Sequence, residues 1–311
     1  MNPCPVCGSD DATPHGPYRG RHPAFADLRR ASCRACGLVY ADPMPGAEAL
    51  HGFNASYYDS AHGVASQPEA PAVRHYHSGI NRIRLDHVLD YCARAGVEPG
   101  SVLEVGPGHG LFAHHLLEAF PDTRYWAVES DVSCLPDLER MGVRVAADPA
   151  DLPAEARDLD LAVASHVLEH VADPRALVAG LLGRLRPGGV LFIEVPCRDH
   201  EHKELDEPHL LFFDKPAMGR LLSDAGAREI ELTYHGRRLS ELTSPAARAA
   251  TVLRKVVRRL GAGALLPSDA KPGVFGDEGG AEEWQVVERF KAHRTWDEPA
   301  WWLRALAVRG D

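Results

Sequence analysis

The sequence predicts an α/β fold in which helices flank a mainly parallel sheet. Three observations predict it: an apolar run that enters a glycine-rich turn at 103–110, further strand-like runs that alternate with helical segments, and turn residues between them. Ligands of such sheets bind beyond the carboxyl ends of the strands. The chain of 311 residues, 45% of them hydrophobic, can bury a core and exceeds one typical domain.

The elements of this sheet are predicted in order by their periodicity and by the residues that separate them. Glu129 closes the second strand and Asp148 the third. These carboxylates, with Glu104 and Ser165, lie at or near the ligand-binding edge of the sheet. The ranges are strand 101–105, helix 111–120, strand 124–129, strand 143–147, strand 159–164, helix 174–186, turn 186–189 and strand 190–195.

The glycine-rich turn, G-P-G-H-G at 106–110, predicts a nucleotide-type cofactor site. Glycine permits backbone angles that are closed to other residues, and backbone N–H groups can then approach a ligand closely. A dinucleotide fingerprint needs G-x-G-x-x-G, but Leu111 stands where the third glycine belongs, which disfavours NAD. An ordinary α/β domain whose glycines only make turns is the alternative.

Glu104 precedes this turn, and three further motifs follow it: V-A-S-H-V-L-E-H at 163–170, L-R-P-G-G at 185–189 and P-H-L-L-F-F at 208–213. As an ordered set over about 101–231, they resemble the motifs of class I S-adenosylmethionine-dependent methyltransferases. The resemblance implies a Rossmann-like sheet flanked by helices, with S-adenosylmethionine as the cofactor.

The resemblance also implies which residues bind that cofactor. Glu129 would hold the ribose, and Asp148 would contact the adenine amino group. Ser165 and His166 would lie beside the sulfonium. The motif residues that complete the site, with the glycines at the methionine end, are Glu104, Gly106, Pro107, Gly108 and Gly110.

A competing motif overlaps the one at 163–170. Residues 166–170 fit the H-x-x-E-H pattern of inverted zinc proteases, in which two histidines one helical turn apart hold a metal. That pattern must lie within a long helix, whereas 159–164 is predicted to be a strand and Asp173-Pro174 ends the segment. The sequence therefore favours a packing or capping role for His170.

Two C-x-x-C-G knuckles near the start of the chain predict a zinc ribbon. Four thiolates around one metal form a closed and therefore structural site. A catalytic dithiol, or iron in a rubredoxin-like site, is the alternative. Cys92, Cys134 and Cys197 lack knuckle spacing and are predicted to be buried thiols. The four expected ligands are Cys4, Cys7, Cys33 and Cys36.

The loop after the strand at 190–195 overhangs the cofactor in this fold, so it is where a catalytic base is expected. Histidine titrates near neutral pH, and His209 is the first candidate, with Glu207 to orient it. A purely packing role for His209 is the alternative. A divalent ion in this loop lacks recognisable ligand spacing; its candidate ligands are Asp199, Glu201, His202 and Asp206.

The combination of ribbon and cofactor motifs resembles bacterial methyltransferases that act on secondary metabolites or sugars. The sugar C-methyltransferases carry an adjacent glutamate–histidine pair, but here Pro208 separates Glu207 from His209. C-, O- and N-methylation of a small molecule therefore all stay open. A nucleotide-sugar acceptor needs phosphate-binding residues, for which Arg74, Arg82 or Arg84 are candidates.

Charge disfavours the main alternative, an RNA methyltransferase with a zinc module. The net charge is −10, whereas proteins that bind the phosphate backbone concentrate positive charge. A binding protein that keeps the fold without catalysis is the other alternative. We expect neither a membrane nor a nucleic-acid partner, and the oligomeric state is not predicted.

Four segments divide the chain: a zinc ribbon at 1–45, a helical connector or lid at 46–99, the cofactor-binding domain at 100–235, and a C-terminal elaboration at 236–311. No apolar run approaches a membrane span and no leader peptide is apparent, so a cytoplasmic location is expected. Further predictions are a link at 67–71, a helix at 75–94, a basic helix at 237–260, a loop at 268–280, and a last strand at 301–308 beside 228–234.

Overall fold

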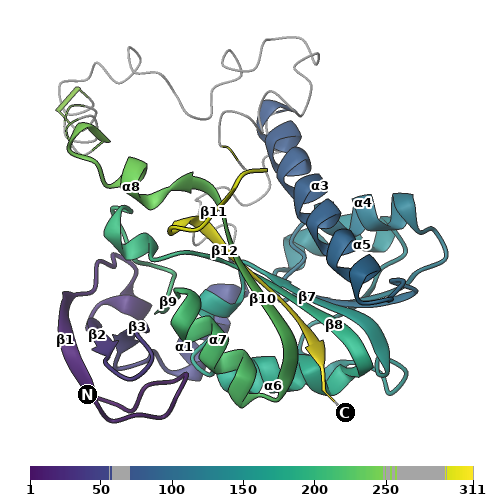
Figure 1. Cartoon of the computed structure of the whole chain (residues 1–311), viewed down its shortest axis with the longest axis horizontal. Coiled ribbons are helices and arrows are strands. Elements are labelled where there is room, and N and C mark those ends of the chain that lie inside the picture. The colour runs from purple at the N-terminus through teal and green to yellow at the C-terminus, as the bar shows by residue number, and fades with distance from the viewer. Residues whose placement is uncertain are drawn as a thin grey trace.

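The computed structural model shows an α/β fold that contains two β-sheets (Figure 1). Among the residues that the structure describes, the larger sheet has eight strands in the order β11-β10-β12-β8-β7-β4-β5-β6, and the smaller has four in the order β1-β2-β3-β9. The structure describes residues 1–55, 57, 71–247, 249, 253, 256, 257, 291 and 293–310, and for 71–76 the backbone alone.

The eight-stranded sheet combines a parallel half with an antiparallel edge. Strands β6, β5, β4, β7 and β8 run parallel, whereas β12 is antiparallel to both β8 and β10. The mostly parallel Rossmann-like sheet is thus confirmed. The bounds are β4 Ser101–Val105, β5 Arg124–Val128, β6 Arg144–Ala146, β7 Leu159–Ser165, β8 Leu185–Pro196, β10 Ala227–Arg238, β11 Thr295–Trp296 and β12 Ala300–Arg309.

Helices cover both faces of this sheet. Successive strand residues point to opposite sides, and apolar side chains on both sides need to be buried. Val102 of β4 packs with α3, α4 and α5, whereas the next residue, Leu103, belongs to the core beneath α6 and α7. Figure 1 shows α3, α4 and α5 together on one side of the sheet, with α6 and α7 on the other. The bounds are α1 Ala47–Asn54, α3 Pro71–Arg94, α4 Leu111–Ala119, α5 Leu135–Arg140, α6 Pro174–Arg184, α7 Lys215–Asp224 and α8 Leu239–Leu242.

The N-terminal sheet receives its fourth strand from a distant part of the chain. Three antiparallel strands, β1 Ala12–Pro17, β2 Arg29–Cys33 and β3 Val39–Asp42, are joined by β9 Leu211–Phe212. Tyr40 pairs with Leu211, and the side chains of this sheet pack into the same core as α6 and α7. The N-terminal sheet is therefore fused to the main domain.

One predicted turn is wrong. Helix α6 ends at Arg184, and the R-P-G-G segment at 186–189 lies within β8. A Cβ on Gly189 would lie 2.8 Å from the Leu159 carbonyl oxygen, so the glycine lets β8 pass close to β7 where the register shifts. The predicted last strand beside 228–234 is confirmed as β12, and its pairing with β10 is antiparallel.

Some predictions fall outside the described part of the chain: the loop at 268–280, nearly all of the link at 67–71 and most of the basic helix at 237–260. Within that last range, β10 continues to Arg238 and α8 follows it. Among the helices that the structure describes, none has the length and apolar character needed to cross a membrane.

Candidate functional site

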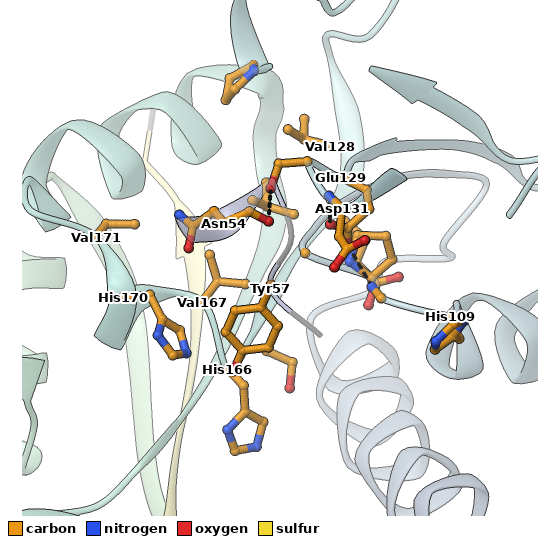
Figure 2. A pocket seen from close by; sticks show the side chains of 18 of the residues that line it. Asn54, Tyr57, His109, Val128, Glu129, Asp131, His166, Val167, His170 and Val171 are labelled. Atoms are coloured by element: carbon orange, nitrogen blue, oxygen red, sulfur yellow. Dashed lines mark hydrogen bonds between the residues drawn. The ribbon is translucent and has the colours of Figure 1, made fainter. Parts of the chain in front are cut away.

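A cavity of about 540 Å³ opens at the carboxyl ends of β4, β5, β6 and β7. In Figure 2, Glu129 and Asp131 lie on one side of it and His170 on the other, with Tyr57 between them. The cavity brings together all but one of the predicted cofactor residues. Those that line it are Glu104, Gly106, Pro107, Gly108, Glu129, Asp148, Ser165 and His166.

The glycine loop after β4 has left-handed backbone angles that favour glycine. Gly106, Gly108 and Gly110 have φ of +66°, +57° and +73°. A Cβ on Gly106 would lie 2.5 Å from Val167 Cγ2, and one on Gly110 would overlap Met141. Gly110 is the predicted residue that does not line the cavity, because it packs against the α5 side.

Glu129 joins the end of β5 to the glycine loop. Its carboxylate accepts hydrogen bonds from the backbone N–H of Gly108 at 2.9 Å and of Asp131 at 2.8 Å. Burial raises the pKa of Glu129, and these hydrogen bonds oppose that shift. The carboxylate therefore braces the loop while it lines the cavity.

Glu104 lies at the floor of the same end of the cavity, 3% exposed. The Tyr125 hydroxyl donates to its Oε2 at 2.6 Å. Burial raises the pKa of Glu104 to about 7, although the Tyr125 hydrogen bond acts in the opposite direction. A cationic group of a ligand would favour the ionised carboxylate here.

His166 extends the wall at the end of β7 with a left-handed backbone, φ +56°. Its Nε2 lies 3.2 Å from Glu194, which also binds Arg84 and Arg304. Burial lowers the pKa of His166, but the Glu169 and Glu194 carboxylates outweigh burial and raise it. The neighbouring Ser165 Oγ is buried without a hydrogen-bond partner in the described chain.

Behind this wall lies the buried His–Glu cluster, which we define as Glu169, His170 and His209. Their exposed fractions are 1%, 8% and 7%, and one potential ligand atom of each lies within 4.8 Å of the others. The rings of His170 and His209 meet edge to face with centroids 4.8 Å apart. His170 lines the cavity, whereas His209 and Glu207 do not.

The expected pairing of Glu207 with His209 is wrong. Glu207 Oε2 accepts from the backbone N–H of Arg21 and His22, so this carboxylate is bound to the N-terminal sheet segment. Asp199 is the partner of His209 instead, with 2.7 Å between Oδ2 and Nδ1. The Pro208 between Glu207 and His209 was the signal in the sequence that the two differ from an adjacent pair.

The remaining acids considered for a divalent ion in this loop are engaged in ion pairs. Asp206 contacts Arg19 and Arg30, and Glu201 contacts Arg198. The zinc-protease pattern also lacks its helix: His166 follows β7, and a single 3₁₀ turn covers Leu168–His170.

The four knuckle cysteines form a separate cluster at the N-terminal sheet. Their Sγ atoms lie within 4.8 Å of one another, with 3.6 Å between Cys4 and Cys36 and 3.5 Å between Cys7 and Cys33. In both knuckles a glycine N–H donates to the first cysteine's carbonyl oxygen, Gly8 to Cys4 and Gly37 to Cys33. The arrangement fits a tetrahedral four-thiolate metal site.

Several cavity residues were not anticipated as site residues. Tyr57 follows α1, and its ring lies 5.6 Å from that of His170. His77 and Asn81 of α3 are also new, and their helical spacing on one face with Arg84 is the signal that could have identified them. Arg84 is committed to Glu194 and so is not a free phosphate-binding residue.

A family model described as "Methyltransferase domain" matches residues 76–232, about half of the chain. A trans-aconitate 2-methyltransferase from Azoarcus sp. (strain BH72) is 34% identical over 147 residues, which is 45% of this chain and 54% of that protein. A ubiquinone biosynthesis O-methyltransferase from Ralstonia nicotianae is 28% identical over 126 residues, 39% of this chain and 52% of that protein. The chain thus spans about half the length of these relatives.

Among solved structures, a possible histamine N-methyltransferase from Thermotoga maritima is similar at 15% identity and a TM-score of 0.44, covering 74% of this chain and 91% of that one. A putative methyltransferase in complex with the Trm112 activator, from Haloferax volcanii, has 16% identity and a TM-score of 0.46, covering 84% and 98%.

Proposed function

The chain belongs to the methyltransferase-domain family, and on this premise we propose that it transfers a methyl group from S-adenosylmethionine to a small-molecule acceptor. One observation carries the proposal: the glycine loop after β4 and the carboxylate after β5 line one cavity and are hydrogen-bonded to each other. A domain with glycines used only for turns needs no such carboxylate at the cavity wall.

The residues present fit the cofactor. We propose that Glu129 accepts the ribose hydroxyls, that Asp148 contacts the adenine side, and that the loop at 106–110 and Glu104 hold the methionine end. Ser165 Oγ, which has no hydrogen-bond partner among the described residues, would lie near the sulfonium. The bound cofactor supplies an electrophilic methyl group for in-line displacement.

The acceptor belongs at the histidine end of the cavity in this proposal. His166 and His170 line that end, and removal of a proton from a hydroxyl acceptor is assigned to His166. His209 is assigned a positioning role, because it contacts His170 and not the cavity. The net charge of −10 and the names of the relatives support a small molecule over RNA.

We also propose that the cysteine cluster binds one structural zinc ion. Four thiolates leave no open coordination position, so such a site stabilises the N-terminal sheet and takes no part in methyl transfer.

Titration calorimetry with S-adenosylhomocysteine tests the cofactor site. We expect Glu129→Ala to weaken binding about 10- to 100-fold, since a charge-assisted hydrogen bond contributes roughly 1.5–3 kcal/mol. Glu139→Ala removes an equal charge from an exposed position outside the cavity and should bind like the wild type. Absence of S-adenosylhomocysteine binding to the wild type, or equal effects of both variants, would refute the proposal. Release of S-adenosylhomocysteine with candidate acceptors then tests turnover.

A further inference from the structure

The carboxylate of Glu169 is buried and lies beside two histidine rings. The residue is 1% exposed, and neither Oε1 nor Oε2 has a hydrogen-bond partner in the described chain. The nearest groups are ring nitrogens, His166 Nδ1 at 3.4 Å and His170 Nε2 at 3.6 Å from Oε1. Leaving a carboxylate unsolvated is costly, so such a site calls for a further partner.

The two histidines of the buried His–Glu cluster are oriented in the same way. His209 Nδ1 lies 2.7 Å from Asp199 Oδ2, and His170 Nδ1 lies 3.3 Å from the Pro208 carbonyl oxygen. Because each Nδ1–H has an acceptor, each Nε2 keeps its lone pair for another partner. Metal-binding histidines in proteins are fixed by this pattern, with a carboxylate or carbonyl behind the ring.

We propose that Glu169, His170 and His209 bind one divalent transition-metal cation at the histidine end of the cavity. Two imidazoles and one carboxylate are a donor set for zinc, iron, cobalt or nickel. The backbone holds the ligands together across the chain, since Leu210 N–H donates to the Glu169 carbonyl oxygen at 2.7 Å. His166 is not a ligand in this proposal, because it does not belong to the group whose ligand atoms all lie within 4.8 Å of one another.

Three protein ligands leave a coordination position open, and His170 places it at the cavity wall. An acceptor with a hydroxyl or carboxylate oxygen can occupy that position. This assignment of acceptor class rests on the proposed function, whereas binding of the cation itself does not.

Cobalt titration of protein whose cysteine cluster is first loaded with zinc tests the proposal. We expect wild-type protein to bind one cobalt ion in addition to its zinc, with a d–d spectrum that lacks thiolate charge-transfer bands. Glu169→Gln, which keeps the side-chain size, should lose the cobalt, and Asp199→Asn should weaken binding about 10- to 100-fold. Glu118→Gln is the matched control, because the exposed Glu118 forms a second group of potential ligands with the exposed His114 and the buried His115.

Three outcomes would overturn the proposal: no cobalt bound by the wild type, cobalt retained by Glu169→Gln, or cobalt lost from Glu118→Gln. Circular dichroism and S-adenosylhomocysteine binding of each variant separate these outcomes from misfolding. If S-adenosylhomocysteine binds and cobalt does not, the metal site fails while the proposed cofactor site stands. If cobalt binds and S-adenosylhomocysteine does not, the proposed function fails while the metal site stands.

Discussion

The two ends of the cavity are built in different ways. At the cofactor end, the glycine loop and Glu129 come from one stretch of about 30 residues, and the hydrogen bond from the Gly108 N–H to Glu129 lies within that stretch. At the histidine end, the loop at 198–209 is held by the N-terminal sheet. The Tyr18 hydroxyl donates to the His209 carbonyl oxygen at 2.9 Å, and Arg19 binds Asp206 nearly 190 positions away.

The N-terminal sheet supports the loop at 198–209. Its strand β3 pairs with β9, and Glu207 accepts hydrogen bonds from the backbone that follows β1. The sheet therefore acts as a scaffold for the loop that carries His209. Damage to the N-terminal sheet should disorder the histidine end first, and damage to the glycine loop should affect the cofactor end alone.

Loss of the cysteine cluster is expected to have the largest effect. Cys4→Ser combined with Cys33→Ser should abolish zinc binding, which contributes on the order of 10 kcal/mol to the folding of small zinc modules. Hydrogen exchange should show loss of amide protection at 12–42 and 198–213, with protection at 101–129 retained. Cys92→Ala, a buried thiol outside the cluster, should keep its zinc. Equal loss of amide protection at 198–213 and at 101–129 would contradict the view that the N-terminal sheet supports the histidine end alone.

Gly106→Ala should have the next largest effect, confined to the cofactor end. The added Cβ meets Val167 at 2.5 Å in a backbone conformation that costs alanine about 1–3 kcal/mol. We expect S-adenosylhomocysteine affinity to fall at least 10-fold while the zinc content is unchanged. Gly142→Ala is the matched control, because φ is +76° there but the space is open. The prediction fails if both variants bind S-adenosylhomocysteine equally well.

Glu104→Gln should change how stability depends on pH. Burial raises the pKa of Glu104 to about 7 in the folded protein from its ordinary value of 4.5, so the folded state binds the proton more tightly. This carboxyl therefore lowers stability as pH rises from about 4.5 to about 7, by roughly 3 kcal/mol. Urea unfolding of the variant should show a flatter profile over that window. The exposed control Glu98→Gln should leave the profile unchanged. An unchanged profile for Glu104→Gln as well would show that Glu104 is not the group responsible.

Tyr18→Phe should have the smallest effect and the most local one. It removes the hydrogen bond to the His209 carbonyl oxygen, which is worth about 1 kcal/mol. Tyr40→Phe removes a similar bond, to the Asn2 carbonyl oxygen, within the N-terminal segment. We expect both variants to lose comparable stability in urea, but only Tyr18→Phe to speed amide exchange at 198–210. Identical exchange in both would argue against a scaffold role.

The cofactor end could be predicted from the sequence because its signals are local. The strands of the parallel half and the cavity position of Glu129 follow from periodicity and from the position of acids after strands. The contacts of the loop at the histidine end could not be predicted, because the partner of Glu207 is the backbone of Arg21 and His22. Pairing between β3 and β9 leaves no periodic signal in a strand of two residues.

The pairing of β3 with β9 has a consequence for how the chain is made. About 170 residues separate Asp42 from Leu211, and at ribosomal speeds of about 5–20 residues per second their synthesis takes roughly 10–30 s. Throughout that interval the edge of β3 opposite β2 lacks β9, the strand that pairs with it in the folded protein. Open strand edges are templates for aggregation. The N-terminal sheet is thus completed only about 170 residues after its first three strands have been made.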